Sequence, residues 1–316
     1  MTLHHSNAFT ETLALREIDW LDTDTMIEAV DQLMMSSTES DVQLLTETSH
    51  HIIGAGGKRV RPRLLLLSYL ALGGTDIDYV LPVAASLELV HTASVVHDDI
   101  NDHGVLRRGR PSINAKWGRT FALLTGDFLF TKVYELMADY SSVNRVFAVS
   151  TKALVEGETL QAAAVKEGNF TPDVYLRVIA LKTAELFRAS TLSGAILAGA
   201  TPSQQDSLSE FGFKVGMAFQ IMDDVLDITG NTEQLGKTAG LDLQQGKGFT
   251  NITDPTANDP MARIKTEMMK GDRLEQASAQ ANHFIESALE DLDGVPDSAP
   301  KDKLIELAHQ VIDRTH

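Results

Sequence analysis

The amino-acid sequence predicts an all-α fold, a single-domain bundle of long helices around a central cavity. Apolar residues recur with helical length or spacing in long stretches of the chain. Segments rich in glycine and proline separate these stretches, and strand-like alternation of apolar and polar residues is scarce. Because most of the expected helices are largely apolar, we expect them to enclose a central helix or cavity.

Residues that interrupt helices bound several of the expected helices. The expected helices are, in chain order, 64–72, 83–97, 118–138, 145–164, 172–198, 203–228 and 274–292. The breaks between them lie at 54–57, 73–74, 168, 199–202 and 230–260. Thr171-Pro172 and Thr201-Pro202 are typical of helix starts, because a capping hydroxyl precedes a first-turn proline.

The composition is that of a globular enzyme. The chain has 316 residues, of which 43% are hydrophobic and 22% charged, enough for a sizeable core. No linker, repeat or low-complexity tract divides it, so we expect one domain over residues 1–316. The net charge of −17 argues against nucleic acid and anionic membrane surfaces as general partners.

Several functional classes are excluded or disfavoured. The absence of cysteine excludes disulfides, thiolate zinc sites and cysteine nucleophiles. Residues 1–20 lack the basic start and apolar core of a signal peptide. No apolar run is expected to approach the roughly 18 residues of a spanning helix. We therefore expect a cytoplasmic protein without stable membrane insertion.

Two aspartate clusters of the form Asp-Asp-x-x-Asp are the strongest functional signal. They are Asp98-Asp99-Ile100-Asn101-Asp102 and Asp223-Asp224-Val225-Leu226-Asp227. On a helix, residues four apart share a face. Clustered carboxylates repel one another unless a cation joins them, and hard oxygen ligands suit Mg²⁺, which commonly bridges carboxylates to phosphate oxygens. Two such clusters in apolar helices favour a metal site over a solvated acidic face.

Each aspartate face continues along its helix into small or apolar residues. Ser94, His91 and Leu87 are expected on the face of Asp98. The face of Asp223 is expected to carry Phe219 and Gly216, with Gln220 at its edge. Core packing would explain these residues equally well without the aspartates. Together with them, the pattern suits a substrate with a polar head and an apolar tail.

Basic residues are clustered in this acidic chain. They lie in the segments Gly56-Gly57-Lys58-Arg59-Val60-Arg61-Pro62 and Leu106-Arg107-Arg108-Gly109-Arg110-Pro111, and at Lys182, Lys237 and Lys247. Arginine and lysine beside carboxylates form either ion-pair networks or oxyanion sites. Arg59, Arg63 and Arg110 are expected to be solvated surface charges.

The chain closely resembles the trans-polyprenyl diphosphate synthases, which elongate isoprenoid chains head to tail. The matching residues are Gly56-Gly57-Lys58-Arg59-x-Arg61-Pro62, Leu89-Val90-His91-Thr92-Ala93-Ser94, His97-Asp98-Asp99-x-x-Asp102, Leu106-Arg107-Arg108-Gly109, Gly126-Asp127, Lys182-Thr183-Ala184, Phe219-Gln220-x-x-Asp223-Asp224-x-x-Asp227 and Gly236-Lys237. They span essentially the whole chain, in the order typical of that family. The resemblance implies a Mg²⁺-dependent condensation of isopentenyl diphosphate with an allylic prenyl diphosphate, and a homodimer.

The resemblance also implies residue roles. Isopentenyl diphosphate would be held by Lys58, Arg61, His91 and Arg108. The allylic diphosphate would be held by Arg107, Lys182, Lys237 and Lys247, with Thr183 and Gln220 nearby. The metal ligands would be Asp98, Asp102 and Asp223, supported by Asp99, Asp224 and Asp227. Catalysis would depend on Lys182, Thr183, Gln220 and Arg107. His97 would support the site through a hydrogen bond.

The sequence leaves open the product length and the effect of one departure from the family. Ala93 and Ser94 are small where short-chain members carry bulk, so we expect a product of geranylgeranyl length or longer. The segment after Lys247 departs from the family and is short, which weakens the expectation for Lys247. The alternatives are a class I terpene cyclase, a non-catalytic subunit of a hetero-oligomeric synthase, and a purely structural helical protein.

Overall fold

The described part of the chain is almost entirely helical, which confirms the all-α prediction. The structure is a computed structural model that describes residues 23–102, 104–169, 171–245 and 273–313. For residue 228, residues 230–245 and residue 273 only the backbone is described. Within these ranges the one sheet is an antiparallel pair of two-residue strands, β1 (Leu106–Arg107) and β2 (Arg110–Pro111).

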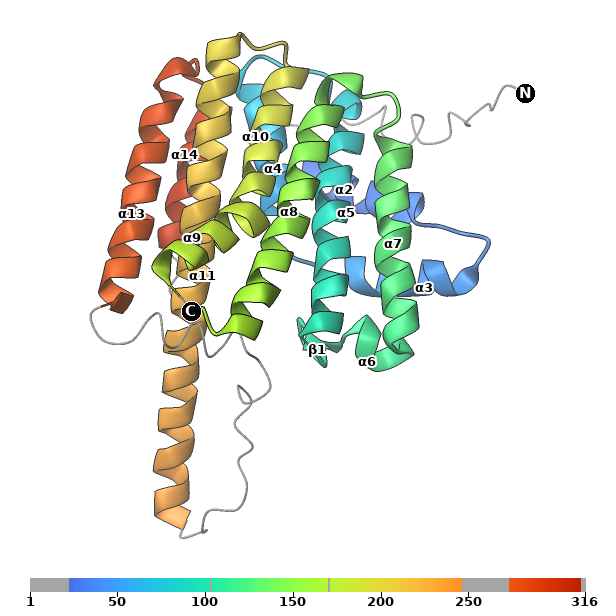
Figure 1. Cartoon of the computed structure of the whole chain (residues 1–316). Helices are drawn as coiled ribbons and strands as arrows, with labels where there is room; N and C mark the ends of the chain where they lie inside the picture. Colours follow the sequence, from blue (N-terminus) through green and yellow to red (C-terminus); the bar gives the residue numbers. More distant parts are fainter. Residues whose placement is uncertain (1–22, 103, 170, 246–272, 314–316) are drawn as a thin grey trace.

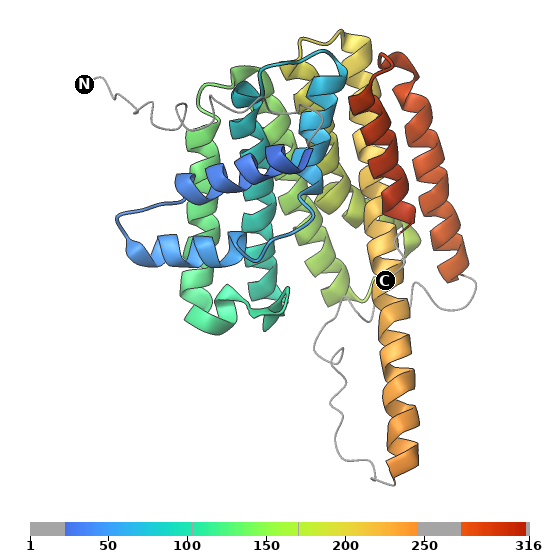
Figure 2. The ribbon, with the colours of Figure 1, turned by 180° about the vertical axis from the view of Figure 1, so that it is seen from behind.

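Long helices stand side by side and form the body of the molecule (Figure 1). In chain order the helical elements are α2 (Thr23–Ser37), α3 (Gln43–Ile53), α4 (Val60–Ala71), α5 (Ile77–Asn101), α6 (Ile113–Trp117), α7 (Arg119–Leu136), α8 (Ser141–Glu167), α9 (Pro172–Ile179), the π-helical turn η1 (Ala180–Ala184), α10 (Glu185–Leu197), α11 (Pro202–Gln245), α13 (Arg273–Asp291), the 3₁₀ turn η2 (Leu292–Gly294) and α14 (Ala299–Ile312). Helices α2 and α3 lie across the long helices on the back of the bundle (Figure 2).

The expected helices are present, with three differences. Helix α11 continues to Gln245, so the first half of the expected break at 230–260 is helical. Helix α9 begins at Pro172 and α11 at Pro202, as predicted, and the Thr171 hydroxyl accepts a hydrogen bond from the Val174 amide. The expected helix 172–198 is interrupted by the π-helical turn η1. Helices α2, α3, α6 and α14 were not predicted, because only part of each is apolar.

Helix α4 is apolar on nearly all sides and therefore packs on two sides. Leu65, Leu66 and Tyr69 belong to an apolar cluster shared with α2, α5 and α7. Leu64 and Leu67 belong to a second cluster shared with α9, α10, α11, α13 and α14. The helix thus joins both halves of the core, and its first turn carries part of the basic segment 56–62 to the cavity described below.

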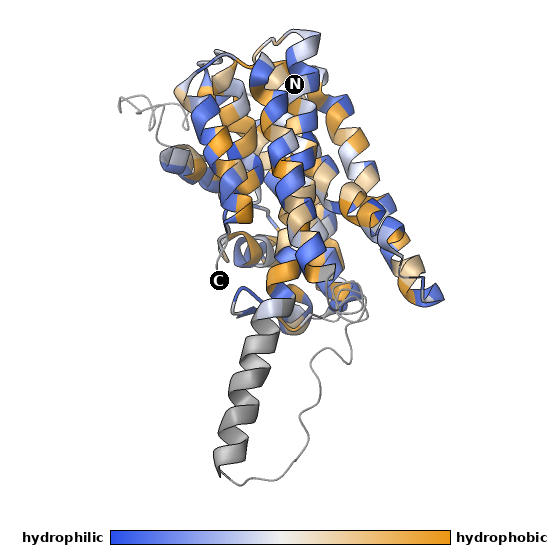
Figure 3. Cartoon of the chain, turned by 90° about the vertical axis from the view of Figure 1, so that its left-hand side faces the viewer, coloured by the Kyte–Doolittle hydropathy of each residue, from blue (hydrophilic) through white to orange (hydrophobic). Residues whose placement is uncertain are grey.

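Helix α5 corrects one expectation. Its sequence contains a window of mean hydropathy 1.4 that is long and apolar enough to cross a membrane by length and composition, and 78% of this window is buried inside the protein. A core helix of a soluble bundle passes the same test, because burial against protein and burial in lipid select the same residues. Outer helices instead mix polar and apolar residues along their length, as α13 does in Figure 3.

Candidate functional site

Most of the predicted site residues line one cavity of about 580 Å³ between α4, α5, the β1–β2 hairpin, η1 and α11. The predicted residues on its wall are Lys58, Arg61, His91, Asp98, Arg107, Arg108, Lys182, Thr183, Gln220 and Asp223. They come from segments more than 160 positions apart in the sequence. The fold therefore brings the aspartate faces and the basic segments together, as the resemblance implied.

The α5 wall of the cavity follows the predicted helix face. His91, Ser94 and Asp98 line it, spaced three or four residues apart. Leu87, expected on the same face, is fully buried in the core below. Asp102 lies just past the last helical residue and its amide still donates to the Asp98 carbonyl at 2.8 Å, so the helical spacing of the cluster is preserved.

The α11 wall agrees with the prediction except at one position. Phe219, Gln220 and Asp223 line the cavity. Gly216 does not, because it lies where α11 meets η1: an added Cβ would be 2.7 Å from the Ala184 Cα. Gly216 therefore permits close helix packing and does not line the cavity.

The second aspartate of each cluster is turned away from the cavity. Asp224 is 1% exposed and accepts hydrogen bonds from the Tyr175 hydroxyl at 2.8 Å and from the Gln220 amide at 3.1 Å. Because Gln220 also accepts from Thr183 at 2.8 Å, Asp224 orients two side chains at the cavity wall. We infer a supporting role for Asp224 that does not require it to touch a metal.

Asp99 has a similar place on α5. It is 7% exposed, and its carboxylate lies 3.5 Å from Arg107 Nε. Burial raises the pKa of Asp99, while Arg107 lowers it. Asp99 thus connects the end of α5 to the hairpin that follows, and it holds Arg107 beside the cavity.

Lys182 projects from the π-helical turn and is shared by two carboxylates. Its ammonium lies 3.2 Å from Asp98 Oδ2 and 2.5 Å from Glu158 Oε2 on α8, and 3.4 Å from the Gln161 amide oxygen. Burial raises the pKa of Asp98 to about 6, with Lys182 opposing the shift. Burial alone would lower the pKa of Lys182, but Asp98 and Glu158 together raise it. The ammonium is therefore charged, and the three groups together carry a surplus negative charge.

The opposite wall of the cavity is basic. Arg61 is buried, and its guanidinium lies over the Phe187 ring at 5.0 Å. Burial is the main cause that lowers the pKa of His91 well below its usual value, and the positive charges of Arg61 and Arg108 lower it further. The imidazole is therefore neutral. A neutral ring can still donate one hydrogen bond to an anion.

Arg108 packs against the glycine-rich loop. It adopts a left-handed backbone conformation with φ 49°, and an added Cβ on Gly57 would lie 2.6 Å from its Nη1. The backbone at Gly57 has φ 152°, a conformation that residues with a side chain rarely adopt. This conformation and the close approach of the guanidinium together favour glycine at position 57.

Four functional contacts were missed or misjudged from sequence. Arg59, expected at the surface, is 4% exposed and bonded to Glu88. Glu158 and Gln161 contact Lys182, and Tyr175 holds Asp224. Arg59 lies in the loop before α4, and the other three residues lie in helices. Because the partner of each lies far away in sequence, no local pattern indicates these contacts.

Two predicted residues have no described side chain at the site. The side chain of Lys237 lies in the part of α11 for which only the backbone is described, and Lys247 lies outside the described residues. Asp102 and Asp227 are exposed beside the cavity rather than part of its wall.

The donor set suits a hard divalent cation. Asp98 and Asp223 face one cavity from two helices, and carboxylate oxygens are the ligands that Mg²⁺ prefers. Among the described residues no three acidic or histidine side chains converge as a ready-made metal group, because Asp98 is turned towards Lys182. Burial nevertheless raises the pKa of Asp98 to about 6, and a bound cation would offset the cost of burying this carboxylate.

Comparison with known proteins identifies the family. The polyprenyl synthetase family model matches residues 42–285. The chain belongs to the polyprenyl synthetase family. The all-trans-nonaprenyl-diphosphate synthase (geranyl-diphosphate specific) of Rhodobacter capsulatus is 36% identical, covering 90% of this chain and 94% of the relative.

Other relatives differ in product and in assembly. The heptaprenyl diphosphate synthase component 2 of Geobacillus stearothermophilus is 38% identical, over 89% of this chain and 93% of the relative. The geranylgeranyl diphosphate synthase of Methanosarcina mazei is 33% identical, covering 91% of this chain and 94% of the relative. A crystal structure of the polyprenyl synthase of Caulobacter crescentus, complexed with calcium and isoprenyl diphosphate, superposes with a TM-score of 0.79 at 31% identity and covers 94% of this chain and 97% of that one.

Proposed function

We propose that this chain condenses isopentenyl diphosphate with an allylic prenyl diphosphate in a Mg²⁺-dependent reaction, giving trans-polyprenyl diphosphates of geranylgeranyl length or longer. Membership of the family makes the chain a trans-polyprenyl diphosphate synthase, a prenyltransferase. The single observation that carries the finer proposal is the cavity with carboxylates and Lys182 on one side and Lys58, Arg61 and Arg108 on the other. Such a cavity has places for two diphosphates.

The allylic side would lie between the aspartate walls. The reaction must break a carbon–oxygen bond, so negative charge develops on the leaving diphosphate, and groups already in position stabilise it. Asp98, Asp102 and Asp223 would hold Mg²⁺, whose charge assists that departure. Arg107 and Lys182 would bind the same diphosphate directly, with Lys237 and Lys247 as further proposed contacts.

The carbocation that remains must be kept from water until the isopentenyl double bond attacks it. The Thr183 hydroxyl and the Gln220 amide oxygen lie at the cavity wall and are fixed by their mutual hydrogen bond at 2.8 Å. Their dipoles would stabilise the cation, and the Phe219 ring shields this wall from water. Loss of a proton from the new chain, with the released diphosphate as its acceptor, restores the allylic end.

The decisive experiment is to size the products made from isopentenyl diphosphate, farnesyl diphosphate and Mg²⁺. We expect linear chains of geranylgeranyl length or longer. Asp98→Ala and Asp223→Ala should lower turnover by several orders of magnitude, roughly 10³-fold or more, while circular dichroism shows an intact fold. Cyclic hydrocarbons would favour a terpene cyclase, and folded variants with full activity would contradict the metal assignment.

The two substrate sites can be separated by steady-state kinetics. Lys58→Ala, Arg61→Ala and His91→Ala should raise the KM for isopentenyl diphosphate more than the KM for the allylic substrate. Lys182→Ala should mainly lower kcat, because its contact strengthens as the leaving group ionises. Equal changes in both KM values from both sets of variants would contradict the assignment of two sites.

We further propose a single-domain homodimer that works in the cytoplasm, without nucleic acid and without stable membrane insertion. Helices α7 and α8 expose apolar side chains that include Phe121, Leu124, Tyr134 and Val149, a composition that suits contact with a second copy. One relative is named as a synthase component, so a partner subunit is the competing hypothesis. Mass measurement of the purified chain, with its activity, tests both.

A further inference from the structure

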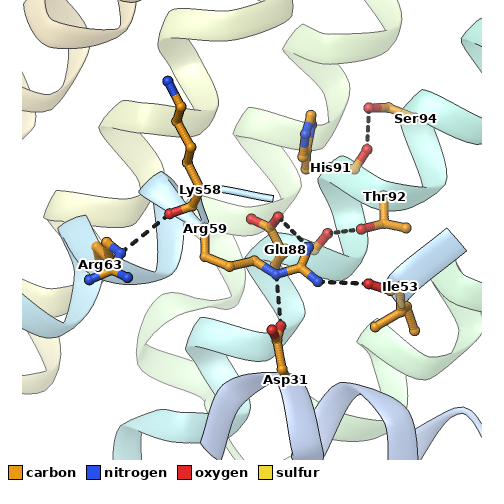
Figure 4. A network of polar contacts seen from close by, with 9 residues as sticks. All are labelled: Asp31, Ile53, Lys58, Arg59, Arg63, Glu88, His91, Thr92 and Ser94. Atoms are coloured by element: carbon orange, nitrogen blue, oxygen red, sulfur yellow. Dashed lines mark hydrogen bonds and ion pairs between the residues drawn. The ribbon is translucent and has the colours of Figure 1, made fainter. Parts of the chain in front are cut away.

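Arg59 lies between two residues assigned to the diphosphate of isopentenyl diphosphate and borders the same cavity, but its guanidinium is bonded to the helices of the bundle. In Figure 4 the side chains of Lys58 and Arg59 extend in opposite directions from the loop. The Arg59 backbone has φ 47° and ψ 41°, the left-handed conformation, at the position just before α4. A residue with a Cβ adopts this conformation only when the surrounding contacts hold it there.

The contacts that hold Arg59 come from three separate segments. Its Nε donates to Asp31 Oδ1 on α2 at 2.7 Å, its Nη1 to Glu88 Oε1 on α5 at 3.0 Å, and its Nη2 to the Ile53 carbonyl at the end of α3 at 2.9 Å. The guanidinium is therefore bonded through all three of its nitrogens, as Figure 4 shows. Arg59 thus ties the loop to three segments of the bundle, and the Arg63 side chain on α4 adds a bond to the Lys58 carbonyl at 3.3 Å.

Glu88 links this buried network to the cavity wall. It is 2% exposed, and its Oε2 is buried without a hydrogen-bond partner among the described residues. Its charge acts on Arg61 and on Arg108, the two arginines assigned to the substrate. A carboxylate among basic side chains is unexpected in an anion site unless it keeps those side chains in place before the anion binds.

Any movement of the loop would reach the other phosphate-binding groups. Gly57 lies directly against the Arg108 guanidinium, where a Cβ would lie 2.6 Å from Nη1. Lys58 precedes Arg59, and Arg61 lies in the first turn of the helix that Arg59 begins. The position of Arg59 thus sets where three cations point.

We propose that Arg59, held by Glu88 and Asp31, is the positioning residue of the isopentenyl diphosphate site. It holds Lys58, Arg61 and Arg108 in the arrangement that binds the diphosphate, and it does not itself contact the substrate. This inference rests on the proposed function, because it takes those three cations as the diphosphate ligands. It predicts a defect confined to one of the two substrates, which a purely structural ion pair would not produce.

The test uses Arg59→Asn, since asparagine tolerates the left-handed conformation and leaves the loop without its anchor. Isopentenyl diphosphate is varied at saturating farnesyl diphosphate, and then the reverse. We expect the KM for isopentenyl diphosphate to rise about tenfold or more, because small displacements of binding groups are costly. The KM for farnesyl diphosphate should stay within about twofold. Equal rises in both KM values, or no rise in a folded variant, would overturn the inference.

Asp31→Asn provides the second variant if Arg59→Asn does not fold. Asp31 lies on α2 outside the cavity, and its side chain is 40% exposed. Its loss should raise the KM for isopentenyl diphosphate alone, by a smaller factor of about threefold. The double variant should then be no worse than Arg59→Asn, because both changes break the same connection. A folded Asp31→Asn with an unchanged KM would contradict the proposal.

Two controls separate positioning from general loss of stability. Lys152→Ala removes an ion pair with Glu156 at the surface of α8. Lys214→Ala removes a partly buried ion pair between α11 and α13, where Nζ lies 2.6 Å from Asp291. Both should leave both KM values within about twofold. A selective rise in the KM for isopentenyl diphosphate in either control would count against a special role for Arg59.

Failure of this inference can be told apart from failure of the proposed function. Lys58→Ala and Arg61→Ala are measured in the same series. If they raise the KM for isopentenyl diphosphate and Arg59→Asn does not, only the positioning role is wrong. If all three leave it unchanged, the assigned diphosphate site is wrong, and the positioning role falls with it.

Discussion

Asp98 and Glu158 share the ammonium of Lys182, which lies 3.2 Å from the first carboxylate and 2.5 Å from the second. Asp98 is largely buried, which raises its pKa from the ordinary 3.8 to about 6. The site is therefore organised at the expense of folding stability, as is common where charged groups are held ready for a ligand.

This shift predicts that Asp98→Asn stabilises the metal-free protein at neutral pH. The folded pKa lies above the unfolded one, so the carboxylate destabilises the fold at pH values above about 6. The cost decreases as the pH falls and disappears below about 3.8, where both states bind the proton. Thermal unfolding in chelator at pH 7.5 should show a melting temperature higher by about 1 °C or more.

The difference should shrink when the same measurement is made near pH 4. Glu156→Gln, which removes an exposed pair with Lys152 on α8, serves as the control and should change little at either pH. A lower melting temperature for Asp98→Asn at pH 7.5 would mean that the ion pair with Lys182 outweighs the cost of burial.

At the scale of elements, the π-helical turn η1 is the feature that presents Lys182 and Thr183 to the cavity. Turns of this kind are uncommon and occur often at functional sites, because the extra residue rotates the side chains that follow. Helix α8 approaches this turn closely at Gly157, where an added Cβ would lie 2.8 Å from the Lys182 backbone nitrogen. The glycine therefore permits α8 to pack against the turn.

Gly157→Ala should consequently lower kcat about tenfold or more, by displacing Lys182, and should also lower the melting temperature. The matched control is Gly168→Ala at the end of the same helix. That glycine has φ 67° and no atom near the position of an added Cβ, so the change should cost about 1 kcal/mol of stability and leave kcat unchanged. Measuring kcat and the melting temperature of each variant separates a displaced Lys182 from a general loss of stability. If kcat fell by the same factor for each degree lost in melting temperature in both variants, the turn would have no special role.

Sequence alone predicted the elements whose burial is periodic and missed those that depend on tertiary contacts. The faces of α5 and α11 follow from 3.6-residue geometry, so His91, Ser94 and Asp98 were placed correctly on one wall. The turn η1 was missed because its hydrogen-bond pattern is set by packing against α8, which no local pattern records. Arg59 was misjudged for the same reason: its partners Asp31 and Glu88 lie about 30 positions away on either side.

At the scale of the whole molecule, two apolar clusters meet at helices α4 and α10, and the polar cavity lies beside this junction. Charged groups gather at the cavity, while the residues of α5 below His91 are buried in the core. This division suits a substrate whose charged head stays fixed while its hydrocarbon tail grows. The limit on product length then depends on side chains along α5 before Asp98.

Ser94 and Ala93 are the positions at which this idea can be tested. Ser94 lines the cavity, and Ala93 is fully buried in the first apolar cluster. A phenylalanine at either position adds a ring that a close-packed wall absorbs only at a cost of about 1–3 kcal/mol. We expect Ser94→Phe to shift the products to shorter chains while condensation with short primers continues. Ala93→Phe should do the same with a greater loss of stability, because its ring displaces core side chains.

Product chromatography, with samples taken at equal turnover, measures the chain lengths that each variant makes. If both variants make the parental lengths, the tail does not pass this turn of α5, and the small side chains here no longer favour a product of geranylgeranyl length or longer.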